Sequence, residues 1–216
     1  MTHIIWDWNG TLFDDLTIVV QSVNAALDRL DAGPIDADGY RDHYTRPVHL
    51  FYDKLLDRPV TNEEWELVDQ AFHEAYRNLL HHGNLAHDAR PALESVIAAG
   101  QTQSLLSMWW HTELVPMARR LGIDGLMTRI DGHRGDATGQ AKAALLAQHL
   151  AALAADLPDV DAVVIGDSLD DARAAETVGI PAVLFDGGTH HRKELEAAGV
   201  PVAGSLLEAV SLAGIV

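Results

Sequence analysis

The sequence contains no cysteine, which excludes disulfide bonds, thiolate catalysis and cysteine-ligated zinc or iron–sulfur sites. Positive charge is also scarce, because 15 basic residues stand against 32 acidic residues and the formal net charge is -17. A surface of this charge repels phosphate backbones, so we expect no nucleic-acid partner. A small anionic substrate would need a local cation or a basic pocket.

Long apolar runs are missing as well. No apolar stretch reaches the roughly 20 residues of a membrane span, so we expect no membrane partner. The first residues, MTHIIWDW, lack the basic segment and cleavage site of a signal peptide, and we therefore expect a cytoplasmic protein. The length of 216 residues suits one domain that carries a smaller inserted or appended domain.

Short apolar runs alternate with longer segments of helical periodicity. Continuous apolar runs indicate strands that are buried on both faces, as in a parallel sheet covered by helices. The pattern predicts an α/β fold with a doubly wound parallel sheet. The predicted strands are residues 3–8, 102–107, 162–167 and 181–186, and the predicted helices are residues 89–100, 111–122, 139–155 and 169–179.

Residues 16–84 have a different character, because they contain no convincing strand and show helical periodicity throughout. Thr61 and Glu64 have the spacing of a capping box, which predicts the start of a helix. We therefore predict an all-helical cap at residues 16–84, inserted into an α/β core formed by residues 1–15 and 85–216.

Polar side chains stand at the ends of three predicted strands. These residues are Asp7, Ser107 and Asp167, and Asp171 follows one helical turn after Asp167. Ligands of parallel sheets bind outside the carboxyl ends of the strands, so we expect these side chains to share one crevice. Carboxylates brought together repel one another, and a hard divalent cation with oxygen ligands, such as Mg²⁺, removes that conflict.

The sequence resembles the haloacid dehalogenase superfamily, in its phosphoglycolate phosphatase-like branch, over nearly the whole chain. The four motifs of that family are matched by Asp7-Trp8-Asn9-Gly10-Thr11, by Ser107, by Lys142 and by Gly166-Asp167-Ser168-Leu169-Asp170-Asp171. Lys142 is the best fit to the third motif because the predicted helix from His111 contains no lysine. The resemblance implies a Rossmann-like core and a helical cap of the C1 type.

The resemblance also implies a role for each matched residue. Asp7 would be the nucleophile that forms an aspartyl-phosphate, and Ser107 and Lys142 would bind the phosphoryl oxygens. The Mg²⁺ ligands would be Asp7, the backbone carbonyl of Asn9, and Asp167, with Asp171 in support. Thr11 would fix the loop after the nucleophile, and Gly10 would permit its turn.

Asn9 departs from the family pattern, which has an acid–base aspartate at this position. An amide cannot exchange a proton near neutral pH. The protein is then a slow phosphatase, or a phosphoryl-binding or regulatory protein that has lost turnover. A third hypothesis is that Asn9, which precedes glycine, deamidates to aspartate.

The substrate expected from the resemblance is a small phosphorylated metabolite. Arg46 lies in the predicted cap, where relatives place substrate contacts, and it suits a second anionic group; a plain surface arginine is an equal interpretation. Our leading prediction is a Mg²⁺-dependent phosphomonoesterase. Hydrolysis at carbon and mutase chemistry stay open, as does a homodimer.

Overall fold

The computed structural model describes residues 1–135, 141–158 and 160–215, which form two compact units. The first, called the core unit, comprises Met1–Phe13, Leu85–Gly188 and Arg192–Val216. The second, called the helical unit, comprises Asp14–Asn84 and Thr189–His191. No helix in the described part of the chain is long and apolar enough to cross a membrane.

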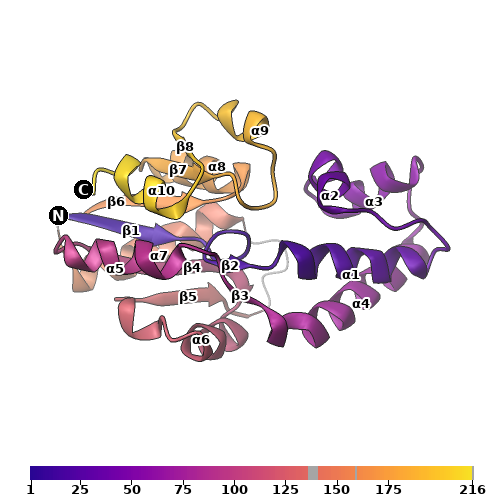
Figure 1. The fold of residues 1–216 in the computed structure, drawn as a ribbon, viewed down its shortest axis with the longest axis horizontal. Helices are drawn as coiled ribbons and strands as arrows, with labels where there is room; N and C mark the ends of the chain where they lie inside the picture. The colour runs from indigo at the N-terminus through magenta and orange to yellow at the C-terminus, as the bar shows by residue number, and fades with distance from the viewer. Residues whose placement is uncertain (136–140, 159, 216) are drawn as a thin grey trace. The chain divides into compact units, whose positions relative to one another are not determined.

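The core unit contains a six-stranded sheet in the order β5-β4-β1-β6-β7-β8, in which every pair of neighbours is parallel (Figure 1). The strands are β1 (Thr2–Trp6), β4 (Thr102–Trp110), β5 (Ile130–His133), β6 (Asp161–Gly166), β7 (Ala182–Phe185) and β8 (Val202–Ala203). The chain builds outward from β1 through β4 to β5 and then returns to the other side of β1 with β6. This reversal creates a switch point beside β1, where ligands of such folds bind.

Helices cover both faces of the sheet, as the doubly wound prediction requires. On one face, α7 (Lys142–Asp156) packs with α8 (Leu169–Val178) over an apolar cluster that includes Ile5, Leu106 and Val164. On the other face, α5 (Ala89–Ala98) packs with α10 (Leu206–Leu212). Helices α6 (His111–Arg120) and α9 (Arg192–Glu196) complete the unit, with a short 3₁₀ turn at Asp124–Leu126. The predicted α/β fold class is confirmed.

Some bounds differ from those predicted. Strand β4 continues to Trp110, so Ser107 lies inside the strand and not at its end. Strand β5 was not predicted because its sequence, IDGH, is short and mostly polar. Strand β8 was not predicted because it contains only two residues. Helix α7 begins at Lys142, and the first residues of the predicted helix, 139 and 140, lie outside the described residues.

The helical unit contains α1 (Leu16–Asp28), α2 (Ala37–His43), α3 (His49–Leu56), α4 (Asn62–Leu79) and a 3₁₀ turn at Leu80–His82. Its own apolar core includes Val23, Phe51 and Val68. The predicted capping box begins α4, because the Thr61 hydroxyl accepts from Glu64 N and Thr61 N donates to the Glu64 carboxylate. Short strands β2 (Phe13–Asp14) and β3 (Asn84–Leu85) pair where the chain passes between the two units.

A chain of buried polar side chains interrupts the apolar interior on the α7 face of the sheet. His3 contacts the hydroxyls of Thr102 at 2.7 Å and of Ser104 at 2.8 Å. Ser104 contacts His149 of α7 at 2.7 Å, and His149 contacts Asp131 of β5 at 2.8 Å. His3, Ser104 and His149 are each at most 1% exposed, and their polar atoms satisfy one another, which limits the cost of burial.

We expect the burial of His3 to make stability depend on pH. Burial lowers the pKa of His3 from 6.5 to about 4, and nearby His149 adds to the effect. A lowered folded-state pKa means that stability is fully present above about pH 6.5 and is lost as the pH falls towards about 4. The loss from this group between pH 7.5 and pH 5 should be about 2 kcal/mol in the free energy of unfolding.

Chemical unfolding at the two pH values, on the natural protein and on His3→Gln, isolates this contribution from that of the other titrating groups. The variant should lose less stability than the natural protein on acidification. Equal losses in the two proteins would show that His3 does not titrate across this range.

Candidate active site

Strand β1 delivers Asp7 to the switch point of the sheet. The four residues before it are buried, and Asp7 N donates to Ile165 O of β6 at 2.8 Å, which extends the strand register by one residue. The Asp7 side chain is 7% exposed. A closed loop follows, in which Phe13 N donates to Trp8 O at 2.9 Å and the two aromatic rings stack 5.0 Å apart. The loop therefore fixes the path of the backbone directly after Asp7.

Strand β6 and helix α8 deliver two more carboxylates. Asp167 directly follows β6, and Asp171 lies in the first turn of α8. The Asp171 Oδ2 atom accepts from Ser168 N at 3.0 Å and from the Ser168 hydroxyl at 2.6 Å. The Asp171 side chain thus caps the start of its own helix, which fixes the carboxylate in one orientation.

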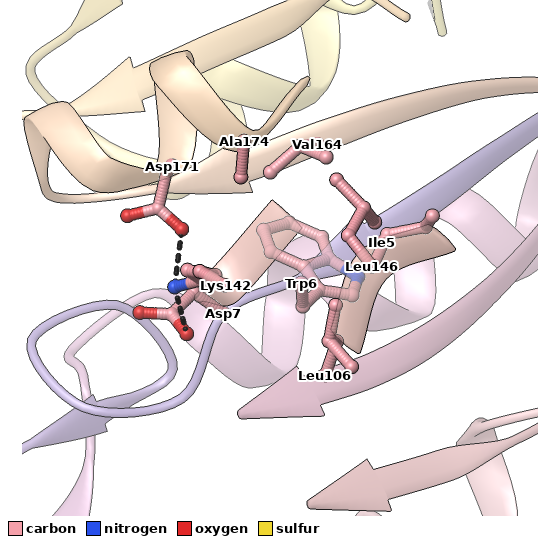
Figure 2. Close-up of a pocket in the computed structure, with 9 residues that line it drawn as sticks. All are labelled: Ile5, Trp6, Asp7, Leu106, Lys142, Leu146, Val164, Asp171 and Ala174. Atoms are coloured by element: carbon pink, nitrogen blue, oxygen red, sulfur yellow. Dashed lines mark ion pairs between the residues drawn. The ribbon is translucent and has the colours of Figure 1, made fainter. Parts of the chain in front are cut away.

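The structure brings the three carboxylates together, as predicted. Oxygen atoms of Asp7, Asp167 and Asp171 lie within 4.8 Å of one another, and all three residues are buried. Lys142, the first residue of α7, places its Nζ atom 2.7 Å from Asp7 Oδ1 and 2.5 Å from Asp171 Oδ1 (Figure 2). One ammonium group therefore bridges two of the three acids. Of the three, Asp7 follows β1, Asp167 follows β6 and Asp171 lies in α8.

The charges of the site do not balance. Burial raises the pKa of Asp7 to about 7, against the opposing influence of Lys142 and with the help of Asp171 and Asp167. Burial alone would lower the pKa of Lys142, but the carboxylates of Asp171 and Asp7 raise it above its ordinary value. Lys142 therefore stays charged, and three carboxylates against one ammonium leave an excess of negative charge.

This arrangement fits a divalent cation such as Mg²⁺. The candidate ligand atoms are carboxylate oxygens, which hard cations prefer, and they already lie within a few ångströms of one another. A bound cation would also offset the repulsion that raises the Asp7 pKa. The third acid, Asp171, forms an ion pair with Lys142 through Oδ1 and accepts from Ser168 at Oδ2, so its charge supports a bound cation.

Two glycines enclose the Asp167 carboxylate. A Cβ atom added at Gly10 or at Gly188 would overlap the Asp167 side chain, so both backbones approach it closely. Gly10 also has φ +72, which L side chains rarely adopt. The Thr11 hydroxyl donates to Asp167 Oδ1 at 3.1 Å. Thr11, predicted to fix the loop, thus connects that loop to the second acid of the site.

Gly10→Ala should weaken cation binding beyond the cost of its backbone strain. Gly100 is a matched control, because its φ of +71 is nearly the same and nothing lies within 4 Å of its added Cβ. The strained φ should lower the free energy of unfolding of each variant by about 1 kcal/mol, and Gly10→Ala should lose more because its Cβ overlaps Asp167. We expect Gly10→Ala alone to raise the Mg²⁺ concentration needed for half-maximal thermal stabilisation. Equal Mg²⁺ responses in the two variants would contradict the close fit around Asp167.

The structure also describes three further predicted residues, Ser107, Asn9 and Arg46. Ser107 is 1% exposed within β4, and its hydroxyl oxygen accepts from Trp109 N at 3.0 Å. Asn9 is half-buried in the loop after Asp7. Arg46 belongs to the helical unit, where it is exposed and donates to the Tyr44 hydroxyl at 3.1 Å. The predicted contacts of these residues with phosphate, metal and substrate stay predictions.

The loop geometry opposes the deamidation hypothesis for Asn9. That reaction requires the Gly10 nitrogen to attack the Asn9 side-chain carbonyl. In the structure, Gly10 N donates to Phe13 O at 3.0 Å within a turn that holds φ at +72. The cyclic intermediate would have to break this hydrogen bond and open the turn, so we expect Asn9 to persist in the folded protein.

Sequence reasoning missed two residues that shape the site. Ser168 fits the pattern Ser-x-x-Asp that begins a helix, so its contact with Asp171 had a readable signal. For Gly188 the sequence offers no signal beyond a pair of glycines after β7. Its backbone lies against the Asp167 side chain, and that contact joins two segments that are separated in the sequence.

A small cavity adjoins the bridged acids. Its volume is about 10 Å³, which is roughly the room that one water molecule needs. It is lined by Ile5, Trp6, Asp7, Leu106, Lys142, Leu146, Val164, Asp171 and Ala174, most of them apolar (Figure 2). A cavity of this size cannot hold a substrate.

Comparisons with known proteins agree on one family. Residues 4–185 match the family model described as haloacid dehalogenase-like hydrolase. Among curated proteins, the phosphoglycolate phosphatase of Chromobacterium violaceum is 23% identical over 194 residues, covering 86% of this chain and 85% of its own length.

The solved structures show the same fold. A haloacid dehalogenase-like family hydrolase from Streptococcus pneumoniae is similar with a TM-score of 0.81 and 20% identity, over 98% of this chain and 97% of that one. Protein Tyrosine Kinase A from Mycobacterium tuberculosis is similar with a TM-score of 0.79 and 22% identity, over 99% of this chain and 98% of that one. Because these two names describe different reactions, the shared fold alone does not decide the chemistry.

Proposed function

Because this chain belongs to the haloacid dehalogenase-like hydrolases, we propose that it is a Mg²⁺-dependent phosphomonoesterase acting on a small phosphorylated metabolite. The observation that carries the proposal is the buried Asp7 carboxylate, held by Lys142 within a cluster of three acids. The curated relative, a phosphoglycolate phosphatase, supports a phosphate ester as the substrate.

In this proposal Asp7 is the nucleophile. An oxygen of its carboxylate forms a bond to phosphorus while the ester bond to the alcohol breaks, which gives an aspartyl-phosphate. Water then cleaves that intermediate, releasing inorganic phosphate and restoring the carboxylate. The ion pair with Lys142 orients Asp7 and favours its ionised form, which is the form that can attack.

The other residues bind the phosphoryl group and the cation. Asp7, Asp167 and the Asn9 carbonyl would hold Mg²⁺, with Asp171 in support, and a bound Mg²⁺ would neutralise the negative charge of the phosphoryl group. Lys142 and Ser107 would donate to the phosphoryl oxygens. Arg46, on the helical unit, would recognise a second anionic group such as the carboxylate of phosphoglycolate.

Asn9 favours a second candidate, a phosphoryl-binding or regulatory protein with little turnover. The amide cannot protonate the leaving alcohol or activate water, and such help is typically worth about 10²–10⁴-fold in rate. Ligand binding does not need that proton transfer. The two candidates therefore differ in turnover and share the binding site.

A panel of phosphorylated metabolites, including phosphoglycolate, tests the proposal by the release of inorganic phosphate with and without Mg²⁺. We expect release from a narrow set of substrates and its loss on chelation. Tight binding of a phosphorylated compound without release would favour the second candidate. Halide release that survives chelation would instead indicate hydrolysis at carbon, and an isomeric sugar phosphate as product would indicate a mutase.

A further inference from the structure

Helix α7 carries Lys142 at its first position and His149 two turns later on the same face. The other buried residues of α7 are Leu145, Leu146 and Leu153, which pack in an apolar cluster with Ile5 and Val164. Among the buried residues described in α7, His149 is therefore the one with a polar side chain, and it contacts the sheet two turns away from Lys142. Its two ring nitrogens reach two different strands, β4 through Ser104 and β5 through Asp131.

The hydrogen bond between His149 and Asp131 has a defined direction. Burial alone would raise the pKa of Asp131, but hydrogen bonds from His149 and Arg129 bring it to about 2. Asp131 is thus ionised and only accepts, so His149 Nδ1 carries a proton. His149 Nε2 contacts the Ser104 hydroxyl at 2.7 Å, and the same hydroxyl contacts His3 Nε2 at 2.8 Å.

A continuous series of buried polar contacts therefore runs from Thr102 through His3, Ser104 and His149 to Asp131. Each separation in it is between 2.7 and 2.8 Å. A second site of hydrolysis does not fit this geometry, although serine, histidine and aspartate meet in the order of a catalytic triad. Ser104 is 0% exposed, and its oxygen is engaged by both histidines.

The polar contacts of His149 determine the placement of α7 more sharply than its apolar contacts do. Hydrophobic packing is non-directional and tolerates small shifts, whereas buried hydrogen bonds fix both distance and orientation. A slip of α7 by one residue would move it by about 1.5 Å and rotate its side chains by about 100°. Such a slip would break both hydrogen bonds of His149 and would remove Lys142 Nζ from its place 2.7 Å from Asp7 and 2.5 Å from Asp171.

We propose that His149 is a positioning residue, which locks α7 to β4 and β5 so that Lys142 bridges the two active-site carboxylates. Its effect on catalysis rests on the proposed function, whereas its effect on the placement of Lys142 does not. The role of His149 is to hold the start of α7 in one register, two turns away from the phosphoryl site.

Reductive methylation of lysine, followed by peptide mass spectrometry, tests the placement of Lys142 without any activity measurement. The chain contains two other lysines, Lys54 and Lys193, and both are exposed, so each protein carries its own reference. Lys142 should react slowly in the natural protein because its side chain is 13% exposed and doubly paired. His149→Leu should raise the methylation rate of Lys142 several-fold relative to the two references.

Two further variants separate positioning from general loss of stability. His149→Gln supplies a donor and an acceptor about as far apart as the ring nitrogens, and it should restore slow methylation. Leu153→Ala removes buried volume from the same helix without touching the polar chain, and it should lower the midpoint of thermal unfolding. We expect slow Lys142 methylation in the folded Leu153→Ala protein.

The kinetic arm uses the same variants with the best substrate of the panel. His149→Leu should lower kcat by about 10- to 100-fold, as expected for a displaced group of the site, and His149→Gln should recover most of it.

Should His149→Leu fail to fold, Ser104→Ala breaks the link to β4 and should also raise Lys142 methylation. Unchanged methylation of Lys142 in folded His149→Leu or Ser104→Ala would overturn the proposal. Changed methylation without any enzymatic activity would retain the positioning role and reject the proposed function.

Discussion

Replacing Asp7 by asparagine is expected to lower Mg²⁺-dependent phosphate release by at least about 10³-fold, because the amide cannot form the aspartyl-phosphate of the proposed mechanism. The stability of the variant should not fall when Mg²⁺ is absent. Burial and the neighbouring carboxylates raise the pKa of Asp7 to about 7, so the ionised form carries a cost that a neutral amide removes. The measurements are kcat on the best substrate and the midpoint of thermal unfolding.

Asp161→Asn is the matched control for this variant. Asp161 is an exposed aspartate at the start of β6, the end of the sheet opposite to Asp167, and its replacement should leave kcat unchanged. Full activity of Asp7→Asn at saturating Mg²⁺ would remove Asp7 from the role of nucleophile. Loss of activity together with loss of folding would leave the role undecided, so the unfolding midpoint belongs to the same experiment.

Asn9→Asp is expected to raise kcat by about 10²–10⁴-fold, since it supplies the acid–base group that the natural chain lacks. The added carboxylate lies in the loop that directly follows Asp7, so it also changes the local charge. Activity must therefore be compared at saturating Mg²⁺ for both proteins. A large gain identifies the natural protein as one whose turnover is limited by proton transfer.

The control for added charge is Asn62→Asp, at an exposed first position of α4, which should leave kcat unchanged. If kcat does not rise in Asn9→Asp, the proton transfer is performed by another group. The same result would also remove the reason to invoke deamidation of Asn9.

The sequence predicted the centre of the sheet well because its strands carry continuous apolar runs. Strands β1, β6 and β7 are buried on both faces, and the acids at positions 7 and 167 are visible as breaks in those runs. The edges of the sheet were missed. In β5, Asp131 and His133 give a polar sequence, and the reason for Asp131 is a hydrogen bond to His149, which no local pattern displays.

The candidate site was predicted in part for a related reason. The cluster of Asp7, Asp167 and Asp171 follows from strand ends that meet at one edge of a parallel sheet. The double ion pair of Lys142 depends on how α7 lies against two other elements, and spacing along the chain does not encode that placement. The extension of β4 beyond Ser107 was likewise missed, because Trp109 and Trp110 continue the strand with residues that are only partly buried.

The Asp171 side chain makes two separate contacts. Its Oδ2 atom accepts from Ser168 N at the start of α8, and its Oδ1 atom forms an ion pair with Lys142. The start of that helix and the charged centre therefore share one carboxylate. When the first turn of α8 is unwound, Lys142 loses one of its two carboxylate partners and keeps Asp7. The double ion pair is therefore complete only in a chain whose α8 helix has formed.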